Sequence, residues 1–100
     1  MPEYNYPKGQ IIANNIVRNG RNYGIGVRGG QNVVITGNNL YGNFGGFYLD
    51  YGAKNVLISG NLVADSSDAA VLFGTEDIRP GFDVLACENI VISGNTFIGN

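Results

Sequence analysis

The chain has 100 residues and a formal net charge of −2 at pH 7, which limits it to one domain and leaves no basic surface for nucleic acid. It contains no histidine, the commonest general base and metal ligand, and its single cysteine, Cys87, excludes an internal disulfide. No apolar run approaches 18 residues, so we expect no membrane span, and the first nine residues show no signal-peptide pattern. The 16 glycines, 14 asparagines and 44% hydrophobic residues favour short strands with tight turns over disorder.

Short apolar segments that end at Asn or Gly recur from residue 10 onward. Residues 10–19 are a weaker copy of three closely matched segments, NVVITGNNLYGN (32–43), NVLISGNLVADS (55–66) and NIVISGNTFIGN (89–100). In each copy the apolar alternation predicts one strand, and a second short strand follows a turn at small residues and Asn.

A further strand is predicted in each interval between these copies. The three segments are YGIGVRG (23–29), GFYLDYG (46–52) and AAVLFGT (69–75). Three short strands and three turns per repeat, with no helix, predict a solenoid in which each repeat forms one coil.

The repeat length follows from the last apolar residue before each turn. These residues are Ile11, Ile35, Ile58 and Ile92, with intervals of 24, 23 and 34 residues. The short intervals indicate a coil of roughly 23 residues, and the long one predicts an insertion at residues 75–87. We assign residues 1–9 to an N-terminal extension and residues 10–100 to a repeat domain of about four coils. Because neither end shows a polar cap, we expect a segment of a longer protein with flanking coils, or a subunit of a homo-oligomer.

Residues 24–29 match the G-x-G-x-x-G fingerprint of dinucleotide-binding proteins. That fingerprint needs a strand before it and a helix after it, whereas here the motif itself predicts a strand and is followed by another strand. We therefore attribute the match to the abundance of glycine and expect no nucleotide cofactor.

Stacked coils place equivalent residues in columns. One predicted column is an asparagine ladder at the turn of each coil, formed by Asn14, Asn38, Asn61 and Asn95. Asn suits this position because its amide bonds the coils above and below and because it tolerates left-handed backbone. A second column is predicted from Asn19, Asn43 and Asn100, with Ser66 replacing Asn once. The alternation predicts these inward residues: Ile25, Val27, Val33, Ile35, Leu40, Phe47, Leu49, Val56, Ile58, Val63, Ala70, Leu72, Ile90, Ile92 and Phe97.

The repeat NVxIsGNxfxGN…Gixl resembles the right-handed parallel β-helix of the pectate-lyase-like superfamily, with NosD-type repeats, over residues 10–100. This resemblance implies an all-β, single-stranded parallel β-helix. In the order usual for that family, residues 23–29, 46–52 and 69–75 would form the first sheet, and each Asn-flanked copy would supply the second and third sheets. The family includes polysaccharide lyases, galacturonases, alginate epimerases and phage tailspikes, which implies an extracellular or virion-surface location.

In that family the substrate lies along the groove of the first sheet. Alternation places Gly26, Tyr48 and Val71 in one outward row and Arg28, Asp50 and Phe73 in another. Tyr48 and Phe73 are aromatic residues of the type that stack on sugar rings. With Arg28, Glu76 and Asp77 they form our predicted substrate-binding set. Ordinary packing on a strand surface explains the two aromatic residues equally well.

Acidic residues gather near the same sheet. We predict Asp50, Asp65, Asp68 and Arg79 as catalytic residues, since paired acids serve glycoside hydrolysis and the lyases that this family includes use a basic residue. Asp50, Asp65 and Asp68 are also the candidate ligands of a Ca²⁺ ion, the one cofactor that we consider. The alternative is a set of solvated turn acids, with Asp50 paired to Arg28 one coil below. No histidine-based or lyase-type catalytic motif of the family is present.

Two functions remain open at this point. The first is a carbohydrate-active β-helix, of lyase, hydrolase or epimerase type, that binds a polysaccharide along the first sheet. The second is a non-catalytic structural segment of a tailspike or adhesin-like surface protein. The second is favoured by apolar residues at outward positions of the second sheet, namely Val34, Leu57 and Val91, which would suit a partner chain.

Overall fold

The computed structural model describes residues 9–50, 52–74 and 87–100. This part of the chain contains eleven strands, and it holds no helix that is long and apolar enough to cross a membrane. The N-terminal extension up to residue 8 and most of the predicted insertion lie outside the described residues.

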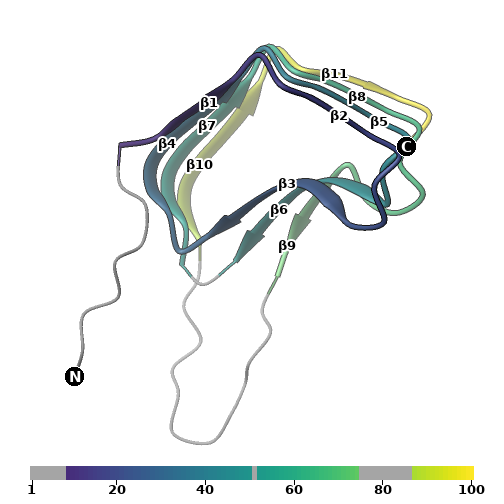
Figure 1. Cartoon of the computed structure of the whole chain (residues 1–100). Helices are drawn as coiled ribbons and strands as arrows, with labels where there is room; N and C mark the ends of the chain where they lie inside the picture. Colours follow the sequence, from purple (N-terminus) through teal and green to yellow (C-terminus); the bar gives the residue numbers. More distant parts are fainter. Residues whose placement is uncertain (1–8, 51, 75–86) are drawn as a thin grey trace, which may run out of the picture.

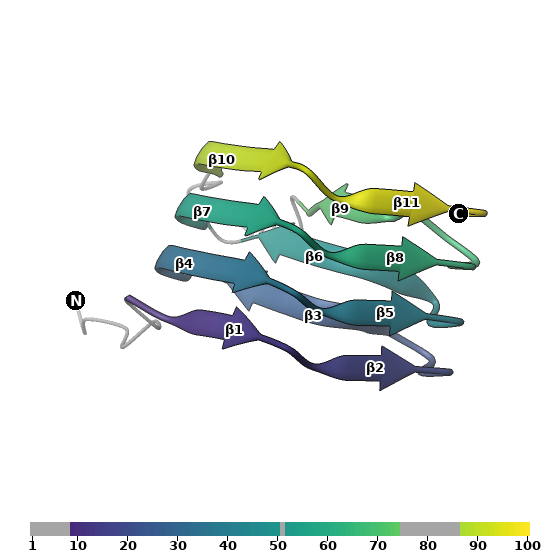
Figure 2. The ribbon, with the colours of Figure 1, turned by 90° about the horizontal axis from the view of Figure 1, so that it is seen from above.

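The strands form three parallel sheets that follow one another around each coil (Figure 1). The first sheet contains β3 (Tyr23–Arg28), β6 (Gly45–Asp50) and β9 (Val71–Phe73). The second sheet contains β1 (Ile11–Ala13), β4 (Gln31–Thr36), β7 (Lys54–Ser59) and β10 (Glu88–Ser93). The third sheet contains β2 (Ile16–Arg18), β5 (Asn39–Tyr41), β8 (Leu62–Ala64) and β11 (Thr96–Ile98). Every strand pairs in parallel with its equivalent in an adjacent coil, so the predicted parallel β-helix is confirmed (Figure 2).

The core consists of columns of like residues inside the coils. In the second sheet, Val33 pairs with Val56 and Ile35 pairs with Ile58, and all four side chains are buried. Strict alternation along β4 and β7 produces this column, because every second side chain of a strand points to the same face. The buried hydrophobic residues are Ile25, Val27, Val33, Ile35, Leu40, Phe47, Leu49, Ala53, Val56, Ile58 and Val63. All of them except Ala53 were predicted to face inward.

The prediction for β9 is wrong by one residue. Val71 pairs with Phe47 and packs against the core, whereas Leu72 pairs with Tyr48 on the outer face. Phe73 pairs with Leu49 and therefore lies on the inner side, not in the outward row. The reason is the corner before β9, since Ser66 follows its equivalent Asn43 by 23 residues but Val71 follows Phe47 by 24. One extra residue in that corner reverses the alternation.

The corners of the coil use left-handed backbone. Besides glycines, the residues with positive φ in the described part of the chain are all Asn or Asp: Asn14, Asn19, Asn32, Asn55, Asp65 and Asn89. These residue types reach the left-handed region at the lowest cost after glycine, because their short polar side chains bond locally. The high Asn content of the chain therefore serves two separate purposes, the turn backbone and the ladder.

The predicted asparagine ladder is confirmed at Asn38, Asn61 and Asn95 and is wrong at Asn14. The backbone and side-chain amides of Asn38 both donate to Oδ1 of Asn61, and those of Asn61 both donate to Oδ1 of Asn95. In the first coil it is Asn15 that donates both amides to Asn38. Asn14 has φ of 59° and occupies the left-handed position that Gly37 fills one coil later. Two adjacent asparagines were thus exchanged, because one suits the left-handed backbone and the other suits the ladder.

The second predicted column needs the same correction. Asn43 accepts a hydrogen bond from the backbone of Gly20, and Asn100 accepts one from the backbone of Ser66. Asn19, with φ of 57°, again lies one position earlier, in the left-handed turn.

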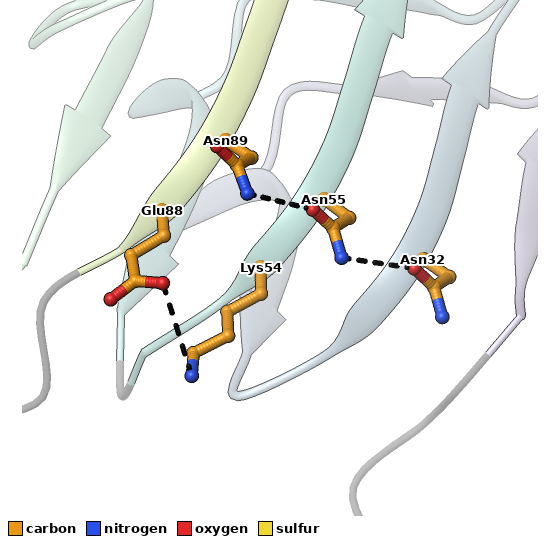
Figure 3. A network of polar contacts seen from close by, with 5 residues as sticks. All are labelled: Asn32, Lys54, Asn55, Glu88 and Asn89. Atoms are coloured by element: carbon orange, nitrogen blue, oxygen red, sulfur yellow. Dashed lines mark hydrogen bonds and ion pairs between the residues drawn. The ribbon is translucent and has the colours of Figure 1, made fainter.

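A third row of amides runs along the outside of the second sheet (Figure 3). Asn89 donates to Asn55, and Asn55 donates to Asn32, while Lys54 lies 4.0 Å from Glu88 beside them. This exposed row was not predicted from the sequence. It marks the left-handed bend within β4, β7 and β10.

Candidate functional site

The outer face of the first sheet carries an aromatic cluster at the edge where its strands begin. The Tyr23 ring lies 5.8 Å from Phe44, edge to face, and 5.4 Å from Tyr48, measured between ring centroids. Phe44 is 44% exposed, whereas Tyr23 and Tyr48 are half-buried. We call Tyr23, Phe44 and Tyr48 the aromatic corner.

Glycine makes room for this cluster. Gly45 pairs with Tyr23 in the sheet, and a Cβ atom at Gly45 would collide with the Tyr23 ring. The ring therefore lies over the glycine backbone of the next coil, where it reaches both Phe44 and Tyr48. The local sequence NFGGFY thus supplies the two aromatic neighbours and the space between them.

A carboxylate adjoins the aromatic corner. The Tyr23 hydroxyl donates a hydrogen bond of 2.5 Å to Oδ2 of Asp68, which is an exposed residue of the corner between β8 and β9. Burial, and then this hydrogen bond, raise the pKa of Tyr23, because both favour the neutral phenol. The backbone amide of Asp68 also donates to the carbonyl of Phe44, so Asp68 is bonded to the aromatic corner through both its side chain and its backbone.

A cation lies on the other side of the aromatic corner. The amides of Phe44 and Gly45 donate to the carbonyls of Gly20 and Asn22, which places the exposed Arg21 one coil before Phe44. Arg21, Phe44 and Asp68 therefore belong to three successive coils along one edge of the first sheet.

The opposite edge of the first sheet carries an ion pair. Nε of Arg28 lies 3.2 Å from Oδ2 of Asp50, and the two side chains are 64% and 2% exposed, respectively. The two residues are paired across β3 and β6, so the pairing that we considered for Asp50 is confirmed. Their part in the predicted substrate-binding and catalytic sets stays a prediction.

The three aspartates proposed as Ca²⁺ ligands are not brought together. Asp50 ends β6, whereas Asp65 and Asp68 precede β9 at the other edge of the sheet, about 16 Å away for a six-residue strand. Across residues 9–50, 52–74 and 87–100, no three His, Cys, Asp or Glu side chains lie close enough to hold a metal ion. The same separation leaves Asp50 and Asp68 too far apart to act as an acid pair.

The other predicted site residues divide into two groups. Tyr48 lies in the predicted outward row beside Gly26, with Leu72 in the place predicted for Val71. Arg79, Glu76 and Asp77 lie outside the described residues. Tyr23, Phe44 and Arg21 were not predicted from the sequence. They lie at or just before the start of a strand, where the conformation of the corner decides whether a side chain points inward or outward. The glycine pair after Phe44 was the one available signal, because adjacent glycines in a strand mark a close approach.

Residues 3–100 match the family model described as the right handed beta helix region. No curated protein and no solved structure matches the chain significantly. The match spans nearly the whole chain and agrees with the all-parallel sheets described above.

Proposed function

The chain belongs to the right-handed β-helix family, and from this premise we propose that it binds a polysaccharide at the aromatic corner of its first sheet. The observation that carries the proposal is an exposed aromatic ring, Phe44, with Arg21 level with it in the coil before and Asp68 bonded to its carbonyl from the coil after. Sugars combine apolar C–H faces with hydroxyl groups, so a ring flanked by an acceptor and a donor is complementary to them.

The arrangement of the rings argues for stacking rather than for a cation cage. A caged quaternary ammonium group lies between rings, within about 6 Å of each centroid. Here Tyr23 contacts both Phe44 and Tyr48 directly, with centroids 5.8 and 5.4 Å apart, so the rings fill the space themselves. The surface accessible to a ligand is therefore the outside of the aromatic corner, where Phe44 is exposed.

Binding is better supported than catalysis. Glycoside hydrolysis uses two carboxyl groups about 5 to 9.5 Å apart across the scissile bond. Among the residues that the structure describes, Asp68 and Asp65 are the acids at one edge of the first sheet, and Asp50 is buried against Arg28 at the other. The catalytic roles of Asp50, Asp65, Asp68 and Arg79 stay predictions, as does a role for Ca²⁺.

The test is affinity electrophoresis of the protein through gels that contain polysaccharides of different composition. We expect the wild type to be retarded by at least one of them, and Phe44→Ala to weaken that binding about tenfold, or about 1.4 kcal/mol. Tyr41→Ala is the matched control, because Tyr41 is a half-buried tyrosine on the outer face of the third sheet. Equal losses in both variants, or no retardation on any polysaccharide, would contradict the proposal.

A structural role is the second candidate, favoured by an apolar row outside the second sheet. Ile11, Val34, Leu57 and Val91 are in register across all four strands, and three of them are 72%, 37% and 53% exposed (Ile11, Leu57 and Val91). Such a row suits contact with a second chain, as in a fibrous surface protein. Sedimentation velocity distinguishes the two functions, since a structural segment associates through this row and Leu57→Lys then lowers the apparent mass.

A further inference from the structure

Charged residues of both signs lie beside the aromatic corner, since Asp68 is bonded to it and Arg21 lies one coil before Phe44. We propose, on the basis of the proposed polysaccharide binding, that this corner takes a neutral pyranose and that Asp68 is the residue that rejects uronate polymers. The inference concerns the substrate class of the same site, and it runs against the acidic polysaccharides that the fold first suggests.

The proposal is supported first by how few Lys and Arg side chains lie near the aromatic corner. The described residues contain four Lys or Arg side chains, and three of them are engaged away from this corner. Arg28 pairs with Asp50 at the far edge of the first sheet, Lys54 lies beside Glu88 on the second sheet, and Arg18 donates to Tyr41 on the third. Of the cations in residues 9–50, 52–74 and 87–100, Arg21 alone therefore lies by the aromatic corner, against Asp68, which is bonded to the corner, and Asp65 three residues earlier in the chain. A polyuronate, with one negative charge per sugar, is repelled by this balance.

The proposal is supported next by the hydrogen bonds of Asp68. Tyr23 occupies Oδ2 of this carboxylate, which leaves Oδ1 for a ligand. An ionised carboxylate accepts hydrogen bonds and donates none, so it is matched by sugar hydroxyls and opposed by a sugar carboxylate. Because the Tyr23 hydroxyl and the Phe44 carbonyl both hold residue 68, the acceptor is positioned before any ligand arrives.

The stacking of the coils places Arg21, Phe44 and Asp68 within reach of one sugar ring. Successive coils are roughly 4.8 Å apart. Arg21 lies level with Phe44 in the coil before it, and Asp68 lies in the coil after it, level with Gly45. A pyranose that stacks on Phe44 presents its rim hydroxyls to Asp68 on one side and to Arg21 on the other. The sugar chain then runs along the stack of coils, across the edge where β3, β6 and β9 begin.

The experiment compares uronate polymers with their carboxyl-reduced forms, which keep the same linkages and ring stereochemistry. Galacturonan, mannuronan and glucuronan are each paired with the reduced neutral polymer, and the dissociation constants are measured at low and high salt. We expect the neutral member of at least one pair to bind at least tenfold more tightly than the uronate. We also expect this ratio to fall with added salt, because screening weakens the repulsion.

Two matched variants locate the discrimination. Asp68→Asn keeps an oxygen for the Tyr23 hydroxyl and removes one charge, so we expect the neutral-to-uronate affinity ratio to fall at least fivefold. Asp65→Asn removes the same charge three residues earlier at a left-handed position that Asn accepts, and we expect less than a twofold change. Equal effects of both variants would contradict the role of Asp68.

The outcomes separate the two proposals. Binding of a uronate polymer as tight as that of its reduced form overturns the inference but leaves polysaccharide binding intact. Failure of every polymer to bind overturns the proposed function itself.

Discussion

Tyr23 is the residue on which the candidate site depends most. It contacts Phe44 and Tyr48 through its ring and Asp68 through its hydroxyl, so a single side chain joins the apolar and polar parts of the site. The Tyr23 ring packs directly against the backbone of Gly45, which holds the ring in place. The same surroundings favour the neutral phenol over the phenolate, which has a measurable consequence.

We expect the wild type to lose stability in alkali faster than Tyr23→Phe does. The pKa of Tyr23 is raised above the ordinary value of 10.0 in the folded chain, so the stabilisation is fully present below that pH. It is lost as the pH rises through the folded-state pKa, since the unfolded chain then ionises first. Urea unfolding at a series of pH values from 8 upward measures this effect. Parallel curves for the two proteins above pH 10.0 would show that the Tyr23 hydroxyl is not held as described.

At the scale of elements, the strands of the first sheet differ in how closely they approach their neighbours. Gly46 of β6 lies at the corner, where a Cβ atom would collide with the backbone oxygen of Ala70 and lie 2.9 Å from Cγ1 of Val63. Gly26 of β3 lies on the outer face, where the nearest atom to an added Cβ is the backbone carbonyl oxygen of Tyr48, at 3.9 Å. One glycine is therefore required by packing, and the other is not.

This contrast predicts opposite effects of the same substitution. We expect Gly46→Ala to lower the free energy of unfolding by about 2 kcal/mol or more, because a backbone atom cannot move aside as a side chain does. We expect Gly26→Ala to be neutral or to stabilise by up to about 1 kcal/mol, through the lower entropy of the unfolded chain. Guanidinium unfolding of the two variants gives both values. Similar losses in both would mean that glycine acts in these strands through backbone conformation alone.

At the scale of the whole molecule, coils are joined by repeated contacts between like residues. Asn61 shows this most clearly, because its amide bonds Asn95 in the next coil and the carbonyl of Ile35 in the previous one. Its oxygen also accepts both amides of Asn38. In a solenoid, where stability is the sum of coils and their interfaces, such a residue contributes to two interfaces at once.

Removal of the inner ladder should therefore cost far more than removal of the outer row. We expect Asn61→Ala to destabilise the chain by about 3 kcal/mol or more, since it leaves several buried donors and acceptors without partners. Asn55→Gly is the control, because it keeps the left-handed backbone and removes only exposed side-chain bonds, and we expect a change within about 0.5 kcal/mol. Thermal and chemical unfolding measure both effects. A comparable loss at Asn55 would indicate that the outer amides support the stack as strongly as the inner ones.

Repetition is what made the fold predictable from the sequence. Copies such as NVVITGN and NVLISGN can stack only if equivalent residues pair in parallel, so the sheets, the core columns and the ladder from Asn38 to Asn95 followed directly. The site was less predictable. Tyr48 was placed on the outer face correctly, and Asp68 was expected near the first sheet, but Tyr23, Phe44 and Arg21 were missed.

The sequence by itself determined the parallel β-helix and its hydrophobic interior, because periodic alternation specifies which strands pair and which side chains are buried. The tertiary structure alone decided which of two neighbouring asparagines enters the ladder, how β9 faces, and that Tyr23 meets Phe44, Tyr48 and Asp68. The physical reason is that these features depend on the corners, where one residue more or less, or one left-handed residue, changes the direction of everything that follows.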